Sequence, residues 1–185
     1  MDWSFIIAQA FSFLSAVAVI IGMQCKNMKM ILLWQSLGNL AVALGYFLLG
    51  GVSGGLICLF AVAQGAVMYL YNQKGRKPHT AVLVGFIVVS IACSAITAYS
   101  TRSIAEIFSA AGALLYTLSI AQQRPAASRL IYLFNPVCWM CYDVFTKAIV
   151  SFIVHLSVFI ATGIGIIRVD ILGKKKADTP EQANA

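Results

Sequence analysis

Residues 30–73 read MILLWQSLGNLAVALGYFLLGGVSGGLICLFAVAQGAVMYLYNQ and contain no charged side chain. A helix that crosses the hydrocarbon core of a bilayer needs about 20 apolar residues, so this run is too long for one crossing. The pairs Gly50-Gly51 and Gly54-Gly55 lie near its middle, where glycine favours a tight turn. The run therefore predicts two membrane-spanning helices joined by a short turn.

The same pattern extends toward both ends of the chain. Apolar runs of spanning length cover 3–25, 80–101 and 104–121, and 126–167 is long enough for two helices joined near Lys147. Hydrophobic residues make up 61% of the chain and charged residues 10%, whereas soluble domains have about 25% charged residues. Backbone amides in hydrocarbon must be paired within a helix or a closed barrel, and the alternation of barrel strands is absent. We predict an all-α membrane protein with seven transmembrane helices.

The basic residues are distributed unevenly between the two sides of the membrane that this topology creates. If the N-terminus lies outside the cytoplasm, the outer side carries only Arg102 and Lys147. Cytoplasmic loops are enriched in Lys and Arg, so this distribution favours an outside N-terminus and a cytoplasmic C-terminus. The net charge of +7 then reflects orientation rather than nucleic-acid binding. The remaining basic residues, all on the inner side, are Lys26, Lys29, Lys74, Arg76, Lys77, Arg124, Arg129, Arg168, Lys174, Lys175 and Lys176.

The first three predicted helices resemble the last three at an offset of 96 residues. At this offset Asn39 matches Asn135, and Tyr46 matches Tyr142. We predict two parallel three-helix repeats joined by a linker helix (3+1+3), an arrangement known in transporters, whose binding site lies between the repeats near the membrane midplane. The predicted parts are a first repeat (1–73), a linker with the fourth helix (74–102), a second repeat (103–172) and a disordered basic cytoplasmic tail (173–185).

Uncharged polar side chains lie at the predicted midplane depth. Asn39, Gln64 and Asn135 are placed where they can converge on a polar, uncharged ligand. The alternative is that these amides only link neighbouring helices, for modest gains of about 0.6 kcal/mol each. Among the aromatic residues, Trp139 and Tyr142 share a helix face with Asn135 and are candidates to stack on a sugar ring, with Tyr46 in the matching position of the first repeat.

Ionisable side chains also occur near the predicted outer ends of the sixth and seventh helices. Asp143 and Lys147 are four residues apart, so they share a helix face and can form an ion pair. His155 lies one turn into the next helix and, with Asp143, is a candidate proton relay. The alternative is a surface ion pair with an interfacial histidine. Glu106 is expected at the interface, where it would satisfy amides at a helix N-terminus.

The sequence offers little for enzymatic chemistry. Cys138 and Cys141 form a C-x-x-C pair, which suggests a membrane thiol oxidoreductase as an alternative, although no second pair lies on an outer loop. His79 and His155 are far apart, and we expect no metal site, no cofactor and no catalytic residues. As partners we expect a small polar solute and the lipid bilayer but no nucleic acid, with a homo-oligomer as an open alternative.

Short motifs carry a family resemblance over nearly the whole chain. The segment Trp139-Met140-Cys141-Tyr142 resembles a Trp-x-x-Tyr pattern of the PQ-loop and SWEET (MtN3-like) transporter superfamily, although the first helix lacks the Pro-Gln pair. The closer resemblance is to YgjV-like bacterial inner-membrane proteins, through residues 7–10, 46–50 and 163–168. This resemblance implies a multi-pass protein of the bacterial inner membrane.

These observations favour a transporter that moves a small polar solute, such as a sugar, by alternating access between two repeats. Two alternatives remain at this point. One is a membrane interaction or scaffold protein that transports nothing, and the other is the thiol oxidoreductase.

Overall fold

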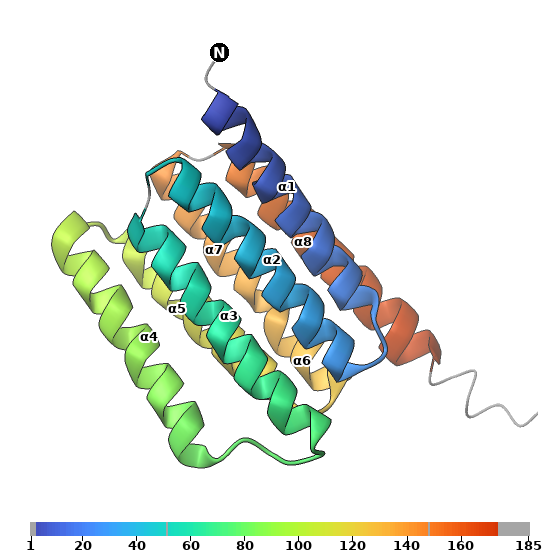
Figure 1. Ribbon diagram of the computed structural model, residues 1–185. Coiled ribbons are helices and arrows are strands. Elements are labelled where there is room, and N and C mark those ends of the chain that lie inside the picture. Colours follow the sequence, from blue (N-terminus) through green and yellow to red (C-terminus); the bar gives the residue numbers. More distant parts are fainter. Residues whose placement is uncertain (1–2, 51, 148, 174–185) are drawn as a thin grey trace, which may run out of the picture.

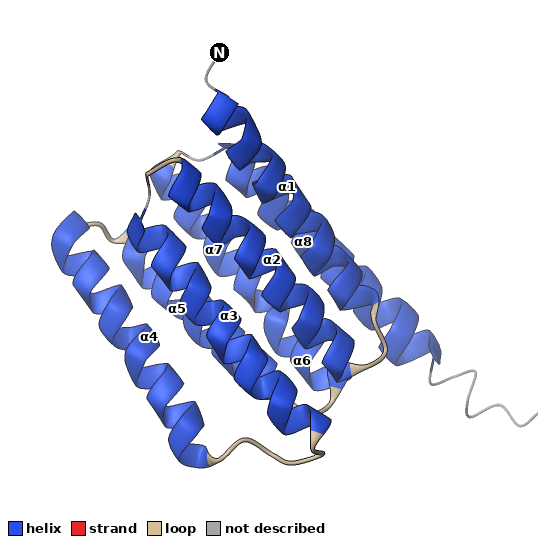
Figure 2. Cartoon of the chain, in the orientation of Figure 1, coloured by secondary structure: helices blue, strands red, loops and turns tan. Residues whose placement is uncertain are grey.

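The computed structural model describes residues 3–50, 52–147 and 149–173 (Figures 1 and 2). This part of the chain is entirely helical apart from short connections. The predicted tail residues 174–185 and the turn residue Gly51 lie outside it. The helices are α1 (Trp3–Gln24), α2 (Met28–Leu48), α3 (Val52–Gln73), α4 (Thr80–Thr101), α5 (Ala105–Ile120), α6 (Pro125–Tyr132), α7 (Phe134–Thr146), α8 (Ile149–Gly165) and a π-helix, Ile166–Ile171.

Two pairs of these elements are continuous rods. Only Leu133 separates α6 from α7, and its backbone stays helical. The break occurs there because Pro136 has no N–H to donate to the carbonyl of Tyr132, four residues earlier. The π-helix continues α8 directly. The described residues thus form seven rods, as predicted, although the α6–α7 break and the π-helix were not foreseen.

The turn between α2 and α3 contains fewer residues than the two glycine pairs suggested. Gly50 has a φ of 74°, in the left-handed region that glycine adopts without a steric cost. Since α3 begins at Val52, the pair Gly54-Gly55 lies inside the helix.

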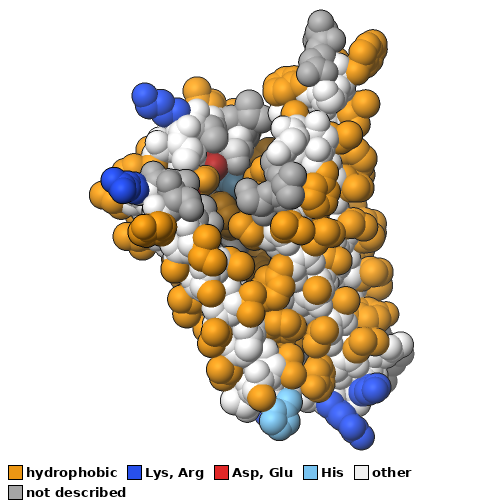
Figure 3. Space-filling model, turned by 60° about the vertical axis from the view of Figure 1, so that its left-hand side comes forward, with side chains coloured by type: hydrophobic (Ala, Val, Ile, Leu, Met, Phe, Trp, Pro, Cys, Tyr) orange, Lys and Arg blue, Asp and Glu red, His pale blue; other side chains and the backbone are white. Residues whose placement is uncertain are grey.

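Apolar side chains cover the flanks of the bundle, and basic side chains lie at its two ends (Figure 3). Many large hydrophobic residues are exposed, as expected where lipid rather than water is the solvent. Helices long and apolar enough to cross a membrane are present in the described chain: Trp3–Gln24, Met28–Leu48, Gly55–Gln73 and Ser151–Ile171, with shorter apolar helices at Thr80–Ile96 and Ala105–Ile120.

The helices pack as a ring with one helix outside it. Helix α2 packs on both α1 and α3, and α7 packs on both α5 and α8. The ring closes where α1 packs on α8 and where α3 meets α5. Helix α4 packs on α5 at the edge of the bundle (Figure 1). We call the end of the bundle where α1 begins the N-terminal end, and the end that holds the π-helix the C-terminal end.

A buried ion pair joins three elements at the C-terminal end. Arg129 of α6 is only 1% exposed. Its Nη2 and Nε donate to the two carboxylate oxygens of Asp170 in the π-helix, at 2.5 and 2.9 Å. Its Nη1 donates to the carbonyl oxygen of Cys25 at 2.6 Å, just after α1 ends. Arg129 was counted among the loop cations from the sequence, but the structure buries it as a structural contact.

Loss of this arginine should destabilise the fold. Arg129→Gln leaves Asp170 without its partner, and breaking a buried ion pair costs about 3–5 kcal/mol. The exposed Arg124 provides the control, because Arg124→Gln removes the same charge at the same end. We expect thermal unfolding in detergent to show a large loss for Arg129→Gln and little change for Arg124→Gln. Equal melting temperatures for the two variants would contradict the assignment.

Two glycines of α8 that look alike in sequence differ in their surroundings. A Cβ on Gly165 would lie 2.6 Å from the carbonyl oxygen of Met23, whereas a Cβ on Gly163 would meet nothing within 4 Å. Close to Gly165, the Gln24 side-chain nitrogen donates to the carbonyl of Ala161 at 2.7 Å, so α1 and α8 approach closely here.

We therefore expect opposite effects from the two alanine substitutions. Gly165→Ala should destabilise the protein by about 1–3 kcal/mol, because the backbone of α1 must move. Gly163→Ala should be neutral or stabilising by up to about 1 kcal/mol, because alanine is the better helix former. Unfolding of both variants in detergent tests this, and an equal loss for the two would rule out the close α1–α8 approach.

Candidate functional site

The predicted amide Asn39 lies in a polar network inside the bundle. Its Nδ2 donates to the hydroxyl of Tyr116 on α5 at 2.9 Å and to the carbonyl of Gln35 at 3.0 Å. The Tyr116 hydroxyl in turn donates to the carbonyl of Ala61 on α3 at 3.4 Å. This network joins α2, α5 and α3 near the middle of α2, which is the depth predicted for Asn39.

Gln64 of α3 reaches the next residue along α5. Its side-chain nitrogen donates to the Thr117 hydroxyl at 3.2 Å, and both residues are buried. The structure therefore brings Asn39 and Gln64 onto adjacent residues of α5, close to one another as the sequence suggested.

Asn135 of α7 contacts α5 one turn nearer to the N-terminal end of the bundle. Its Nδ2 donates to the carbonyl of Gly112 at 2.7 Å. A Cβ on Gly112 would lie 2.9 Å from Nε1 of Trp139, so the indole packs directly on this glycine. All three predicted amides thus converge on α5, and each donates a hydrogen bond to a protein group.

A further amide, Gln35, was missed from the sequence. It is 1% exposed, and neither its side-chain nitrogen nor its oxygen has a hydrogen-bond partner in the described part of the chain. Buried amides normally make such bonds, so this one calls for an explanation. It lies four residues before Asn39, on the same face of α2, and that spacing was the signal that could have identified it.

The second polar group lies toward the N-terminal end of the bundle. Asp143 of α7 is 3% exposed, and its Oδ2 lies 2.6 Å from Nδ1 of His155 on α8. The His155 ring stacks on Trp139, with ring centroids 5.9 Å apart, and Trp139 meets Tyr142 edge-on. Asp143 and His155 were predicted together as a candidate proton relay, and the structure places their side chains in contact.

The predicted pairing of Asp143 with Lys147 is wrong. Helix α7 ends at Thr146, and the backbone of the next residue, Lys147, turns into the left-handed region with a φ of 57°. Lys147 is exposed beyond the end of the helix, whereas Asp143 is buried beside His155. The carboxylate therefore pairs across helices rather than along its own.

Glu106 lies near the start of α5, as predicted, and its side chain is buried. It sits in the first turn of α5 and accepts a hydrogen bond from the Ser109 hydroxyl at 2.9 Å. Tyr46, in the last turn of α2, is 44% exposed. Figure 3 shows an acidic and a histidine side chain beside each other in a hollow at the N-terminal end.

A comparison with known protein families identifies the family of this chain. The model of the Imp-YgjV family, described as a bacterial inner membrane protein, matches residues 6–172. The chain belongs to the Imp-YgjV family. This confirms the YgjV-like resemblance and a bacterial inner-membrane protein. Comparisons with curated proteins and with solved structures gave no match.

The part that matches the Imp-YgjV family contains both polar groups, the Arg129 ion pair and the C-x-x-C pair. Cys138 and Cys141 are free thiols, half-buried one turn apart on α7. Their redox activity stays a prediction.

The contact between Asn39 and Tyr116 can be measured with a double-mutant cycle. We expect Asn39→Ala and Tyr116→Phe to be coupled by about 0.6–1.7 kcal/mol, because hydrogen bonds between membrane helices have this size. Thr162→Val is the control, since the Thr162 hydroxyl donates within its own helix, to the carbonyl of Val158. Additive effects of Asn39→Ala and Tyr116→Phe on unfolding in detergent would show that the two side chains do not interact.

Proposed function

We propose that this Imp-YgjV protein moves a small polar solute across the bacterial inner membrane by alternating access between two three-helix units. One unit is α1–α3, and the other consists of α5, the α6–α7 rod and α8. In each unit the middle helix packs on both of its neighbours, which supports two parallel repeats with α4 as the linker. The units meet along α1 with α8 and α3 with α5, and these seams are where one unit would rock against the other.

The observation that carries the proposal is the unpartnered amide of Gln35 beside Asn39 in the bundle interior. Polar side chains inside a membrane are costly and generally serve a function. If these amides only linked helices, each would be expected to have a partner, as Asn39, Gln64 and Asn135 do. Gln35 instead keeps one donor group and one acceptor oxygen available at the depth where a transporter binds its solute.

The two ends of the bundle differ in a way that fits one state of an alternating-access cycle. At the C-terminal end, Arg129 ties α6 to the π-helix and to the end of α1, so it connects both units. At the N-terminal end the surface is hollowed above the buried polar groups (Figure 3). Passage of a solute through the C-terminal end would require the contacts of Arg129 to break.

The chemistry of the interior favours an uncharged solute rich in hydroxyl or amide groups. Asn39, Gln64 and Gln35 supply donors and acceptors, and no charged group is among these three. Trp139, Tyr142 and Tyr46 are the aromatic candidates toward the N-terminal end, where Asp143 and His155 are proposed to relay a proton during transport. In this proposal the N-terminus faces the periplasm, as the distribution of basic loops predicts.

A thermal-shift screen of the detergent-purified protein tests the proposal. The compounds are sugars, nucleosides, vitamins and amino acids, applied to the wild type, to Gln35→Leu and to Thr162→Val. A ligand that binds only the folded state raises the melting temperature; at 100 times its Kd it stabilises by about 2.7 kcal/mol. We expect one solute class to stabilise the wild type and Thr162→Val but not Gln35→Leu.

Uptake into proteoliposomes of the compound so identified completes the test. Transport by the wild type and its loss in Gln35→Leu would support the proposal. Binding without any transport, or an unchanged shift in Gln35→Leu, would contradict it and favour the alternative in which the buried amides serve only assembly.

A further inference from the structure

A groove on α3 at the C-terminal end is separate from the interior network. It has a volume of about 330 Å³ and is lined by Val67, Leu70, Tyr71, Lys74 and Arg76. Helix α4 packs mainly on α5, and its few contacts with α3 include the edge-to-face pair Phe60–Phe86, so α4 covers α3 only in part. Leu70 is 54% exposed on a helix long and apolar enough to cross a membrane, so it is available to a lipid chain.

The groove changes character along the helix axis. Residues 67, 70, 71 and 74 follow the i, i+3, i+4, i+7 spacing of one helix face. The apolar side chains come first and the cations last, separated by about 10 Å at 1.5 Å per residue. A phospholipid has the same order, with an acyl chain toward the midplane and a phosphate at the membrane surface.

The position of Arg76 is fixed by the way α3 ends. Gly75 has a φ of 63°, and the Arg76 amide donates to the carbonyl of Tyr71 at 3.0 Å. This is the bond between residues five apart that defines a Schellman motif. The backbone thus folds back and places Arg76 so that it lines the groove together with Tyr71.

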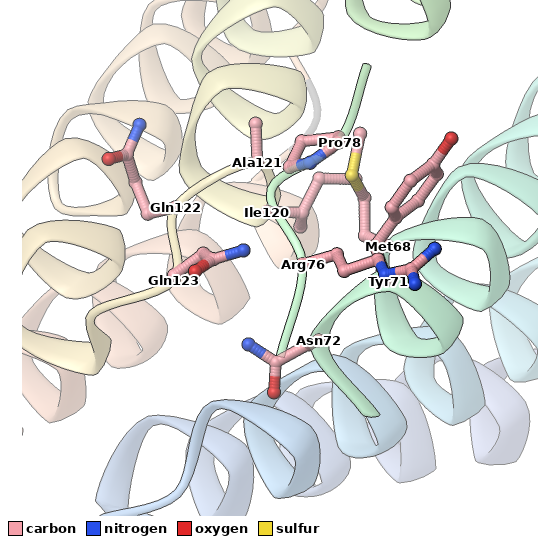
Figure 4. Close-up of a pocket in the computed structure, with 9 residues that line it drawn as sticks. All are labelled: Met68, Tyr71, Asn72, Arg76, Pro78, Ile120, Ala121, Gln122 and Gln123. Carbon is pink, nitrogen blue, oxygen red and sulfur yellow. The ribbon is translucent and has the colours of Figure 1, made fainter. Parts of the chain in front are cut away.

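A small polar pocket adjoins the groove. Its volume is about 10 Å³, room for roughly one water-sized group, and it shares Tyr71 and Arg76 with the groove (Figure 4). Gln123, from the loop after α5, also lines this pocket, and its side-chain nitrogen is buried without a hydrogen-bond partner in the described chain. A phosphate or headgroup oxygen next to Arg76 would accept from this donor.

We infer that the groove binds an anionic phospholipid, with an acyl chain along Val67 and Leu70 and the phosphate at Lys74 and Arg76. The charge complementarity of two exposed cations at the end of an apolar face selects an anionic lipid over a zwitterionic one. The site is independent of the proposed transport activity, since none of its residues belongs to the interior network.

Native mass spectrometry of the purified protein with dioleoyl phosphatidylglycerol or dioleoyl phosphatidylcholine tests the inference. We expect the wild type to bind the anionic lipid more tightly. Lys74→Gln/Arg76→Gln should weaken that binding roughly 25-fold, at about five-fold per lost cation near a lipid surface. The matched control, Lys26→Gln/Arg124→Gln, removes two exposed cations from other loops at the same end and should keep the wild-type affinity.

Other variants and ligands separate the remaining explanations. Leu70→Asn keeps both cations, so it should weaken binding of the lipid without affecting binding of inorganic phosphate. Glycerol 3-phosphate, which has no acyl chain, should not compete with the lipid. Equal binding of the two lipids, equal losses in the two double variants, or full competition by glycerol 3-phosphate would each overturn the proposed lipid site.

Discussion

The structure depends on the requirement that polar groups inside a hydrocarbon solvent find partners within the protein. Helices satisfy this for the backbone, which is why the chain forms seven rods. The side chains meet the same requirement across helices: Asn39, Gln64 and Asn135 all donate to groups on α5. Helix α5 is therefore the common partner: Asn39 and Gln64 reach it from the first unit, and Asn135 reaches it from within its own unit. Gln35 departs from this rule with both its donor and its acceptor.

The Arg129 ion pair applies the same principle to full charges. An unpaired arginine would be very costly in the interior, but the carboxylate of Asp170 and the carbonyl of Cys25 share its donors. These contacts join α6, the π-helix and the end of α1, and they hold the C-terminal end together. The opposite end has no comparable contact between the two units among the described residues, since Asp143 and His155 both belong to the second unit.

Much of the fold follows from the sequence because charge and length control where a chain can cross a bilayer. The long apolar runs predict every rod, and the amides Asn39 and Gln64, predicted at similar depth, bond adjacent residues of α5. The ion pair between Asp143 and Lys147 was predicted from spacing alone, which carries no information on where α7 ends. The partner of Arg129 depends on a contact between distant helices, since Asp170 lies 41 residues along the chain, and no local pattern encodes it. Gln35, in contrast, could have been identified from the sequence, because it lies four residues before Asn39 and therefore on the same helix face.

The central claim is that the two units move against each other about a polar site, with Arg129 holding one end closed. Spin labels measure this directly in a cysteine-free background. One labelled pair, at residues 26 and 124, spans the two units at the C-terminal end, and another, at residues 49 and 104, spans them at the N-terminal end. With Asp170→Asn, which breaks the ion pair, the account predicts a longer distance for the first pair and a shorter one for the second. Unchanged distances at both ends, in a variant that remains folded, would contradict alternating access through this fold.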